Sequence, residues 1–70
     1  MNKRRLKLTK YQIKIIELLC LDYGQKNIAS ETITSLSKVE KELKYLRSIF
    51  EVRTNNGLVY KYTISRLGSL

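Results

Sequence analysis

The chain has 70 residues, with 14 Lys and Arg against 6 Asp and Glu, which gives a formal net charge of +8 at pH 7. This length allows one domain with a small core, and a surface this basic attracts polyanions, chiefly nucleic acid and anionic membrane. No apolar run approaches the roughly 20 residues that span a bilayer, and the polar start is unlike a signal peptide, so we expect a cytoplasmic protein without a membrane partner.

Enzymatic activity has little support in the composition. The chain has no His and a single Cys, it lacks a glycine-rich phosphate loop, and its acidic residues are not clustered as a metal or acid–base site. Cys20 lies between Leu19 and Leu21 in an apolar segment, which predicts a buried core thiol rather than a redox or metal-binding one. We therefore expect no catalysis, no metal and no cofactor.

The N-terminal segment is strongly basic. Residues 1–7 contain four Lys or Arg and no acidic residue. Such a run is usually a frayed, solvated terminus, but it is also suited to lie along DNA phosphates and raise affinity without reading sequence. We predict a flexible arm here, with Arg4 and Arg5 as candidate DNA contacts, followed by one domain over residues 8–70.

The first predicted helix has signals at both ends. Thr9 and Gln12 form a capping-box pattern, in which a hydroxyl and an amide satisfy two backbone N–H groups, and an apolar run follows at once. Gly24 is expected to stop this helix, and a shorter second helix is predicted over about residues 25–32, where it would bury Ile28. The face that the first helix should turn to the core consists of Gln12, Ile15, Ile16, Leu19 and Cys20.

The third predicted helix covers about residues 36–50 and begins near Ser35 or Ser37. Its apolar residues recur on a 3.6-residue period and predict one buried stripe, made of Val39, Leu43, Leu46 and Phe50. Rotation by about 100° per residue places four polar residues opposite that stripe, namely Ser37, Lys41, Lys44 and Ser48. Lysines on an outward face are usually solvated charge, but they are also donors suited to guanine in the major groove.

The last segment permits two structures. Asn55 or Asn56 could cap a helix that packs Leu58 and Tyr62 inward. Alternatively, the same asparagines could turn a β-hairpin at about residues 50–64, which would make a winged helix-turn-helix domain. Local propensity favours the hairpin, because Val, Tyr, Thr and Ile are frequent here.

One spacing pattern runs through most of the chain. It consists of Leu8, Thr9, Leu18, Leu19, Lys26, Ile28, Ala29, Ser35, Val39, Phe50 and Val52. In this order and without a gap, the pattern resembles that of the LuxR-type, or GerE-like, helix-turn-helix family. The resemblance implies an all-α domain of four helices over residues 8–70, and it makes us prefer a helix to the hairpin for the last segment.

The resemblance also implies a function and a site. Members of this family bind double-stranded DNA as transcriptional regulators, often as homodimers, with the third helix in the major groove. Carried over to this chain, Lys26 would contact phosphate, and the groove would be faced by Lys38, Val39, Glu40, Lys41 and Lys44; Ser37 joins them from its place opposite the buried stripe. Val39 would share its side chain between the core edge and a thymine methyl group. The dimer contact would use the exposed parts of Leu58, Tyr62 and Leu67.

Two acidic residues depart from the family pattern. Glu40 stands where the family usually has Lys or Arg, and Glu42 stands where it commonly has His. Glu40 could accept a hydrogen bond from cytosine N4, pair with Lys44, or close a capping box from Ser37, and we prefer the two structural roles. The sequence identifies no role for Glu42. These carboxylates motivate an alternative function, in which the same fold binds a partner regulator protein instead of DNA.

Other departures concern packing and regulation. Gln12 and Asn55 replace a Glu of the first helix and a later Arg, which suggests that one polar contact has been exchanged as a pair. Thr32 and Thr34 replace apolar residues, and Ile33 between them is expected to take over their burial. Most family members carry a receiver or ligand-sensing domain before the helix-turn-helix, and we expect none before this one. If this is the whole protein, we expect regulation through its abundance or a partner; an excised domain would have lost its sensor.

Overall fold

The computed structural model describes residues 7–67 of the chain. These residues fold into four helices and contain no strand. The helices are α1 (Lys10–Cys20), α2 (Gln25–Thr32), α3 (Leu36–Ile49) and α4 (Asn55–Leu67). The all-α prediction is therefore confirmed, and the alternative hairpin at about 50–64 is wrong. Of the predicted basic arm, only Lys7 is described, so Arg4 and Arg5 lie outside the described residues.

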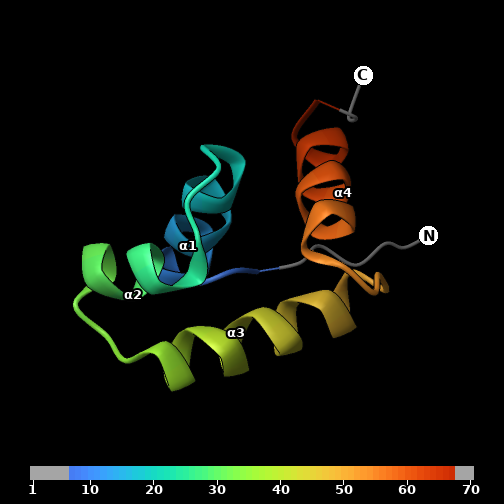
Figure 1. The fold of residues 1–70 in the computed structure, drawn as a ribbon. Coiled ribbons are helices and arrows are strands. Elements are labelled where there is room, and N and C mark those ends of the chain that lie inside the picture. Colours follow the sequence, from blue (N-terminus) through green and yellow to red (C-terminus); the bar gives the residue numbers. More distant parts are fainter. Residues whose placement is uncertain (1–6, 68–70) are drawn as a thin grey trace.

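The longest helix, α3, lies along one side of the molecule, beneath α1 and α2 at one end and α4 at the other (Figure 1). α2 packs mainly against α3, and α4 contacts both α1 and α3. The core between them contains the fully buried side chains of Ile15, Ile16, Ile28, Val39, Leu43, Leu46 and Leu58. Phe50 is also buried, so the predicted stripe on the third helix is confirmed.

α1 begins at the predicted capping box. The Thr9 hydroxyl accepts from the backbone N–H of Gln12 at 3.0 Å, and the Gln12 side chain accepts from the Thr9 N–H at 2.9 Å. The predicted inward face is wrong at Cys20, which is exposed. The buried face is centred near Ile15, and five residues further along a helix the direction has turned by about 140°. Leu18 is buried on the other side of that centre.

α4 forms despite its β-prone composition. Its first turn is capped by Thr54, whose hydroxyl accepts from the backbone N–H of Gly57 at 2.9 Å, so the predicted cap at Asn55 or Asn56 is wrong by one or two residues. Leu58 is fully buried and Tyr62 nearly so, as a helix that faces the core at steps of four requires. Burial of this apolar face against α1 and α3 outweighs the local preference for strands, which spans only about 1 kcal/mol.

The first three helices end in the same way, and none of the ends uses glycine. Each has a residue in the left-handed region, followed by a residue whose N–H bonds to a carbonyl five residues back, which is the Schellman arrangement. The left-handed residues are Asp22, Ile33 and Glu51, with φ of 69°, 55° and 59°. Gly24 was predicted to stop α1, but it has φ of −75° and lies at the N-cap of α2.

Ile33 is the most unfavourable of these three helix ends. A β-branched residue at positive φ is strained by roughly 1–2 kcal/mol, and its side chain is 91% exposed, so the expectation that Ile33 is buried is wrong. We expect Ile33→Gly to raise the free energy of unfolding by about 1 kcal/mol, because the relieved strain exceeds the added entropy of the unfolded chain. Urea denaturation followed by circular dichroism measures the change.

A matched control is available in α4. Ile64 is also exposed, but it lies within a regular helix, so Ile64→Gly should instead destabilise the protein by about 1 kcal/mol. Equal effects of the two substitutions would contradict the strain assigned to Ile33.

Candidate nucleic-acid interface

α3 presents one polar face to solvent, and its cap and its buried side fix the direction of that face. The N-cap is Ser35, whose hydroxyl accepts from the backbone N–H of Lys38 at 3.1 Å. Val39, Leu43 and Leu46 are buried on the inner side. The opposite side, which we call the outer face of α3, consists of the exposed residues Ser37, Glu40, Lys41, Lys44 and Ser48.

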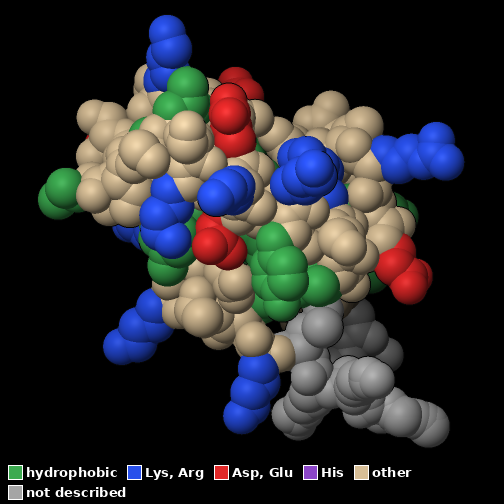
Figure 2. Space-filling model, turned by 90° about the horizontal axis from the view of Figure 1, so that it is seen from below, with side chains coloured by type: hydrophobic (Ala, Val, Ile, Leu, Met, Phe, Trp, Pro, Cys, Tyr) green, Lys and Arg blue, Asp and Glu red, His purple; other side chains and the backbone are tan. Residues whose placement is uncertain are grey.

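The outer face of α3 carries two lysines that extend into solvent. Lys41 and Lys44 are exposed, and neither makes an ion pair with any residue from 7 to 67. A view onto α3 from below shows Lys and Arg side chains over and around this face, with fewer carboxylates among them (Figure 2). Their ammonium groups are thus available to phosphate or to acceptors on base edges.

Lys38 differs from these two lysines, although it is also exposed. Its Nζ lies 5.0 Å from the centre of the Tyr11 ring and 3.8 Å from Oε2 of Glu42. Glu42 in turn accepts from Nε2 of Gln12 at 3.0 Å. Glu42, for which the sequence identified no role, therefore joins α3 to α1 and holds Lys38 on the protein surface.

Gln12 and Asn55 do not form the exchanged pair that the sequence suggested. Gln12 bonds to Glu42, whereas Asn55 accepts from Nη1 of Arg47 at 2.7 Å. Each of them fastens a different part of α3, since Glu42 lies in its first half and Arg47 in its last turn. The two contacts are separate and both are made to α3.

The connection between α2 and α3 is held by hydroxyl groups. The Tyr11 hydroxyl is 3.1 Å from Oγ1 of Thr34, which is 2.8 Å from Oγ1 of Thr32, and Thr32 donates to the Ile28 carbonyl at 2.7 Å. This chain of hydrogen bonds accounts for two threonines at positions where apolar residues were expected. Tyr11 contacts both this connection and Lys38, so it ties the start of α3 to α1.

Several predicted contacts are placed away from the surface. Val39 is 0% exposed, so it cannot reach a thymine methyl group from a folded protomer. Leu58 is also 0% exposed and Tyr62 is buried, which corrects their assignment to a dimer contact. Both face the core of their own protomer because α4 uses that side to pack on α1 and α3. The side chain of Leu67 lies outside the described residues.

Other exposed residues were not identified from the sequence. Tyr45 is 54% exposed and follows Lys41 by one helical turn, beside the outer face of α3. The sequence could have identified Tyr45, because it is an aromatic residue of α3 that does not belong to the buried apolar stripe. Lys26, the predicted phosphate contact, is exposed in the first turn of α2.

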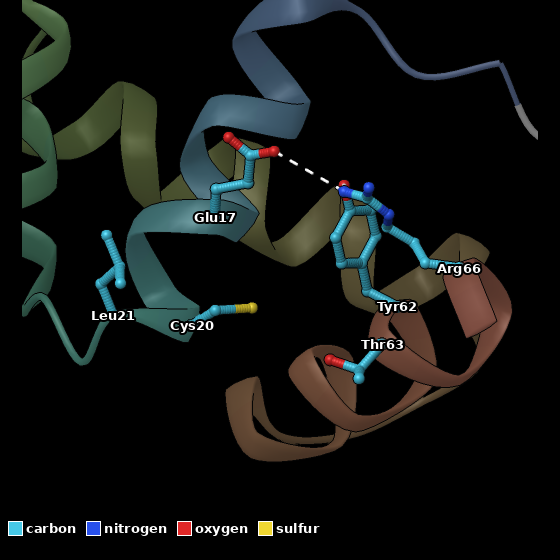
Figure 3. A pocket seen from close by; sticks show the side chains of 6 residues that line it. All are labelled: Glu17, Cys20, Leu21, Tyr62, Thr63 and Arg66. Atoms are coloured by element: carbon cyan, nitrogen blue, oxygen red, sulfur yellow. Dashed lines mark hydrogen bonds and ion pairs between the residues drawn. The ribbon is translucent and has the colours of Figure 1, made fainter.

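A groove of about 510 Å³ separates the end of α1 from α4 (Figure 3). Its lining residues are Glu17, Cys20, Leu21, Tyr62, Thr63 and Arg66. Arg66 donates to the Tyr62 hydroxyl at 3.3 Å and lies 3.8 Å from the Glu17 carboxylate. The hydrogen bond from Arg66 to Tyr62 raises the pKa of Arg66 above its ordinary value. The charged groups that line the groove, Arg66 and Glu17, therefore form an ion pair with each other.

Comparison of the chain with family models, with curated proteins and with solved structures found no match. Among residues 7–67, no helix has the length and apolar character needed to cross a membrane. The same residues hold no group of three or more Cys, Asp or Glu placed to bind a metal ion.

Proposed function

We propose that this chain is a sequence-specific, double-stranded DNA-binding protein, a small transcriptional regulator that acts in the cytoplasm. In this proposal α2 and α3 form a helix-turn-helix of the LuxR type, and α3 enters the major groove. The observation that carries it is the pair of solvent-directed lysines, Lys41 and Lys44, on a helix fixed by its buried side. Lysine donates to O6 and N7 of guanine, and the major groove admits one helix.

Most of the affinity would come from phosphates, whose contacts position the protein without reading sequence. Lys26 supports this role, because it lies in the first turn of α2 and its N-cap, Gly24, has no side chain to occupy the N–H groups there. A phosphate at this end would meet both the lysine and those N–H groups. Arg4 and Arg5 are further candidates from their sequence alone, and the net charge of +8 favours the same partner.

The salt dependence of duplex binding tests the proposal. We expect affinity for a labelled mixed-sequence duplex, measured by fluorescence anisotropy between about 50 and 200 mM salt, to fall linearly on logarithmic axes. Lys26→Ala should reduce the slope by about one and weaken all sequences similarly, since one phosphate contact is lost. Lys14→Ala removes an exposed lysine from α1 and is the control.

The possible outcomes are distinct. A wild-type protein that binds no duplex at the lowest salt would rule out the function. An unchanged slope for Lys26→Ala, together with strong binding by the wild type, would remove only the phosphate contact assigned to Lys26.

We also propose that two copies bind a two-fold site and meet through α4. Because Leu58 and Tyr62 are buried, the contact is assigned instead to Tyr60, which is 66% exposed, and to Ile64. These residues are four positions apart and form an apolar stripe on the outer side of α4. The proposal requires that Tyr60→Glu weaken self-association in sedimentation while leaving the protomer folded.

The second candidate function is a helix-turn-helix fold that binds a partner regulator protein. The observation that favours it is the set of exposed large apolar side chains, namely Leu21, Ile33, Tyr45, Tyr60 and Ile64. Of these, Tyr60 and Ile64 lie one turn apart on α4, and a contiguous exposed apolar patch, unlike single scattered residues, is typical of a protein-binding surface. This function needs no duplex binding, so the anisotropy experiment separates the two candidates.

A further inference from the structure

One carboxylate stands among the lysines on the outer face of α3. Glu40 is exposed, its neighbours at steps of three and four residues are Ser37 and Lys44, and Lys41 lies on the other flank of the outer face. A negative charge on a surface that meets phosphates is repelled by them, and the repulsion weakens binding to every sequence. On the proposed DNA-binding surface, this repulsion is offset only if Glu40 has a partner, either within the protein or on the DNA.

The structure excludes the two partners of Glu40 within the protein that the sequence favoured. A capping box from Ser37 would need Ser37 at the N-cap, but the N-cap is Ser35, and Ser37 lies inside the helix. The ion pair expected with Lys44 is absent, and Glu40 makes no ion pair with any other described residue. Glu42, two positions further on, behaves differently because it is half-buried and bound by both Gln12 and Lys38.

We propose that Glu40 determines sequence specificity by accepting a hydrogen bond from the N4 amino group of cytosine in the major groove. This inference rests on the proposed function. In that groove guanine presents only acceptors, thymine presents an acceptor and a methyl group, and adenine places an acceptor beside its donor. Cytosine alone offers a donor without an adjacent acceptor, so it suits a carboxylate best.

The neighbouring donors complete the pattern. Lys44 lies one helical turn beyond Glu40 and Lys41 lies on the opposite flank of the outer face, and lysine suits guanine O6 and N7. The outer face of α3 would therefore present one acceptor, at its flank, beside two donors. Such a face selects a site in which a cytosine lies close to guanines on the strands that line the groove.

Removal of the carboxylate should have two effects of opposite sign. Affinity for mixed-sequence DNA should rise by about twofold to fivefold, because repulsion by phosphates is lost. Discrimination against a base that lacks the amino donor should fall, because the carboxylate that accepts from cytosine N4 has been removed. A carboxylate that is merely solvated would produce the first effect and leave discrimination unchanged.

The experiment selects duplexes from a random pool with the wild-type protein and then replaces each C·G pair of the selected site by T·A. We expect one such position to weaken wild-type binding by roughly 10-fold. With Glu40→Ala that loss should shrink to less than about twofold, while losses at the other positions persist. Glu40→Gln should shift the preference at the same position toward adenine, which an amide contacts through both N6 and N7.

Two controls accompany these variants. Glu31→Ala removes an exposed carboxylate from α2 and should leave the base preference at every position unchanged. Ala and Gln are both good helix formers, so the Glu40 variants should keep the thermal stability of the wild type.

Two results would overturn the inference. If Glu40→Ala keeps the wild-type loss at every C·G position, Glu40 does not read cytosine, although the helix still reads DNA. If the wild type selects no sequence and binds no duplex, the proposed function fails and the inference fails with it.

Discussion

Reversing the charge of Lys41 or Lys44 is expected to lower the affinity for double-stranded DNA by about 100-fold at moderate salt. Each change removes a donor to a base edge or phosphate, whose loss is worth roughly 1–3 kcal/mol, and places a carboxylate against the phosphates. Both lysines are exposed and make no ion pair with the described residues, so the fold should be unaffected. Fluorescence anisotropy with Lys41→Glu and Lys44→Glu measures the loss.

Two further variants separate a groove contact from general charge. Lys14→Glu makes the same change in net charge on α1 and should weaken binding much less, because screening limits charge effects beyond about 10 Å. Lys38→Met removes an ammonium that already rests on Tyr11 and Glu42, and it should change affinity by less than about threefold. Equal losses in all four variants would argue against insertion of α3 into the groove.

The second large effect concerns the core. Leu58→Ala should lower the free energy of unfolding by about 3 kcal/mol, because it removes a fully buried side chain and leaves a cavity between α4 and the other helices. For a chain of 70 residues the total stability is of the order of 3–10 kcal/mol, so much of the folded population would be lost on warming. Urea denaturation followed by circular dichroism gives the value.

The same experiment distinguishes a core residue from a dimer contact. Tyr60→Ala, on the exposed side of the same helix, should change the stability of the protomer by less than about 0.5 kcal/mol at low protein concentration. If Leu58→Ala behaved like Tyr60→Ala and acted only at concentrations where copies associate, the position of α4 on the core would be wrong.

Local signals in the sequence were sufficient to predict the capping box of α1 and the buried side of α3. Thr9 and Gln12 are three residues apart, and Val39, Leu43 and Leu46 follow one helical period, so neighbouring residues carry the whole pattern. In α1 the apolar residues are too dense to define one face, and the exposure of Cys20 could not be read from them.

The contacts that position α3 could not be predicted from neighbouring residues. Gln12 and Glu42 are separated by 30 positions, and each would be an ordinary surface residue if the chain were only a set of helices. The last segment shows the same limit, since its β-prone residues become helical once Leu58 can be buried against α1 and α3. Propensity describes the isolated segment, whereas burial depends on the rest of the fold.

The fastening of α3 at two points along its length has a consequence for how it would meet a duplex. Glu42 ties its first half to α1, and Arg47 ties its last turn to Asn55 at the start of α4. The helix therefore cannot roll about its own axis without breaking one of these bonds, and the direction of its outer face is set before any encounter. In the proposed complex α3 would need little further ordering when it contacts the duplex. This preorganisation, rather than additional contacts, would favour tight binding.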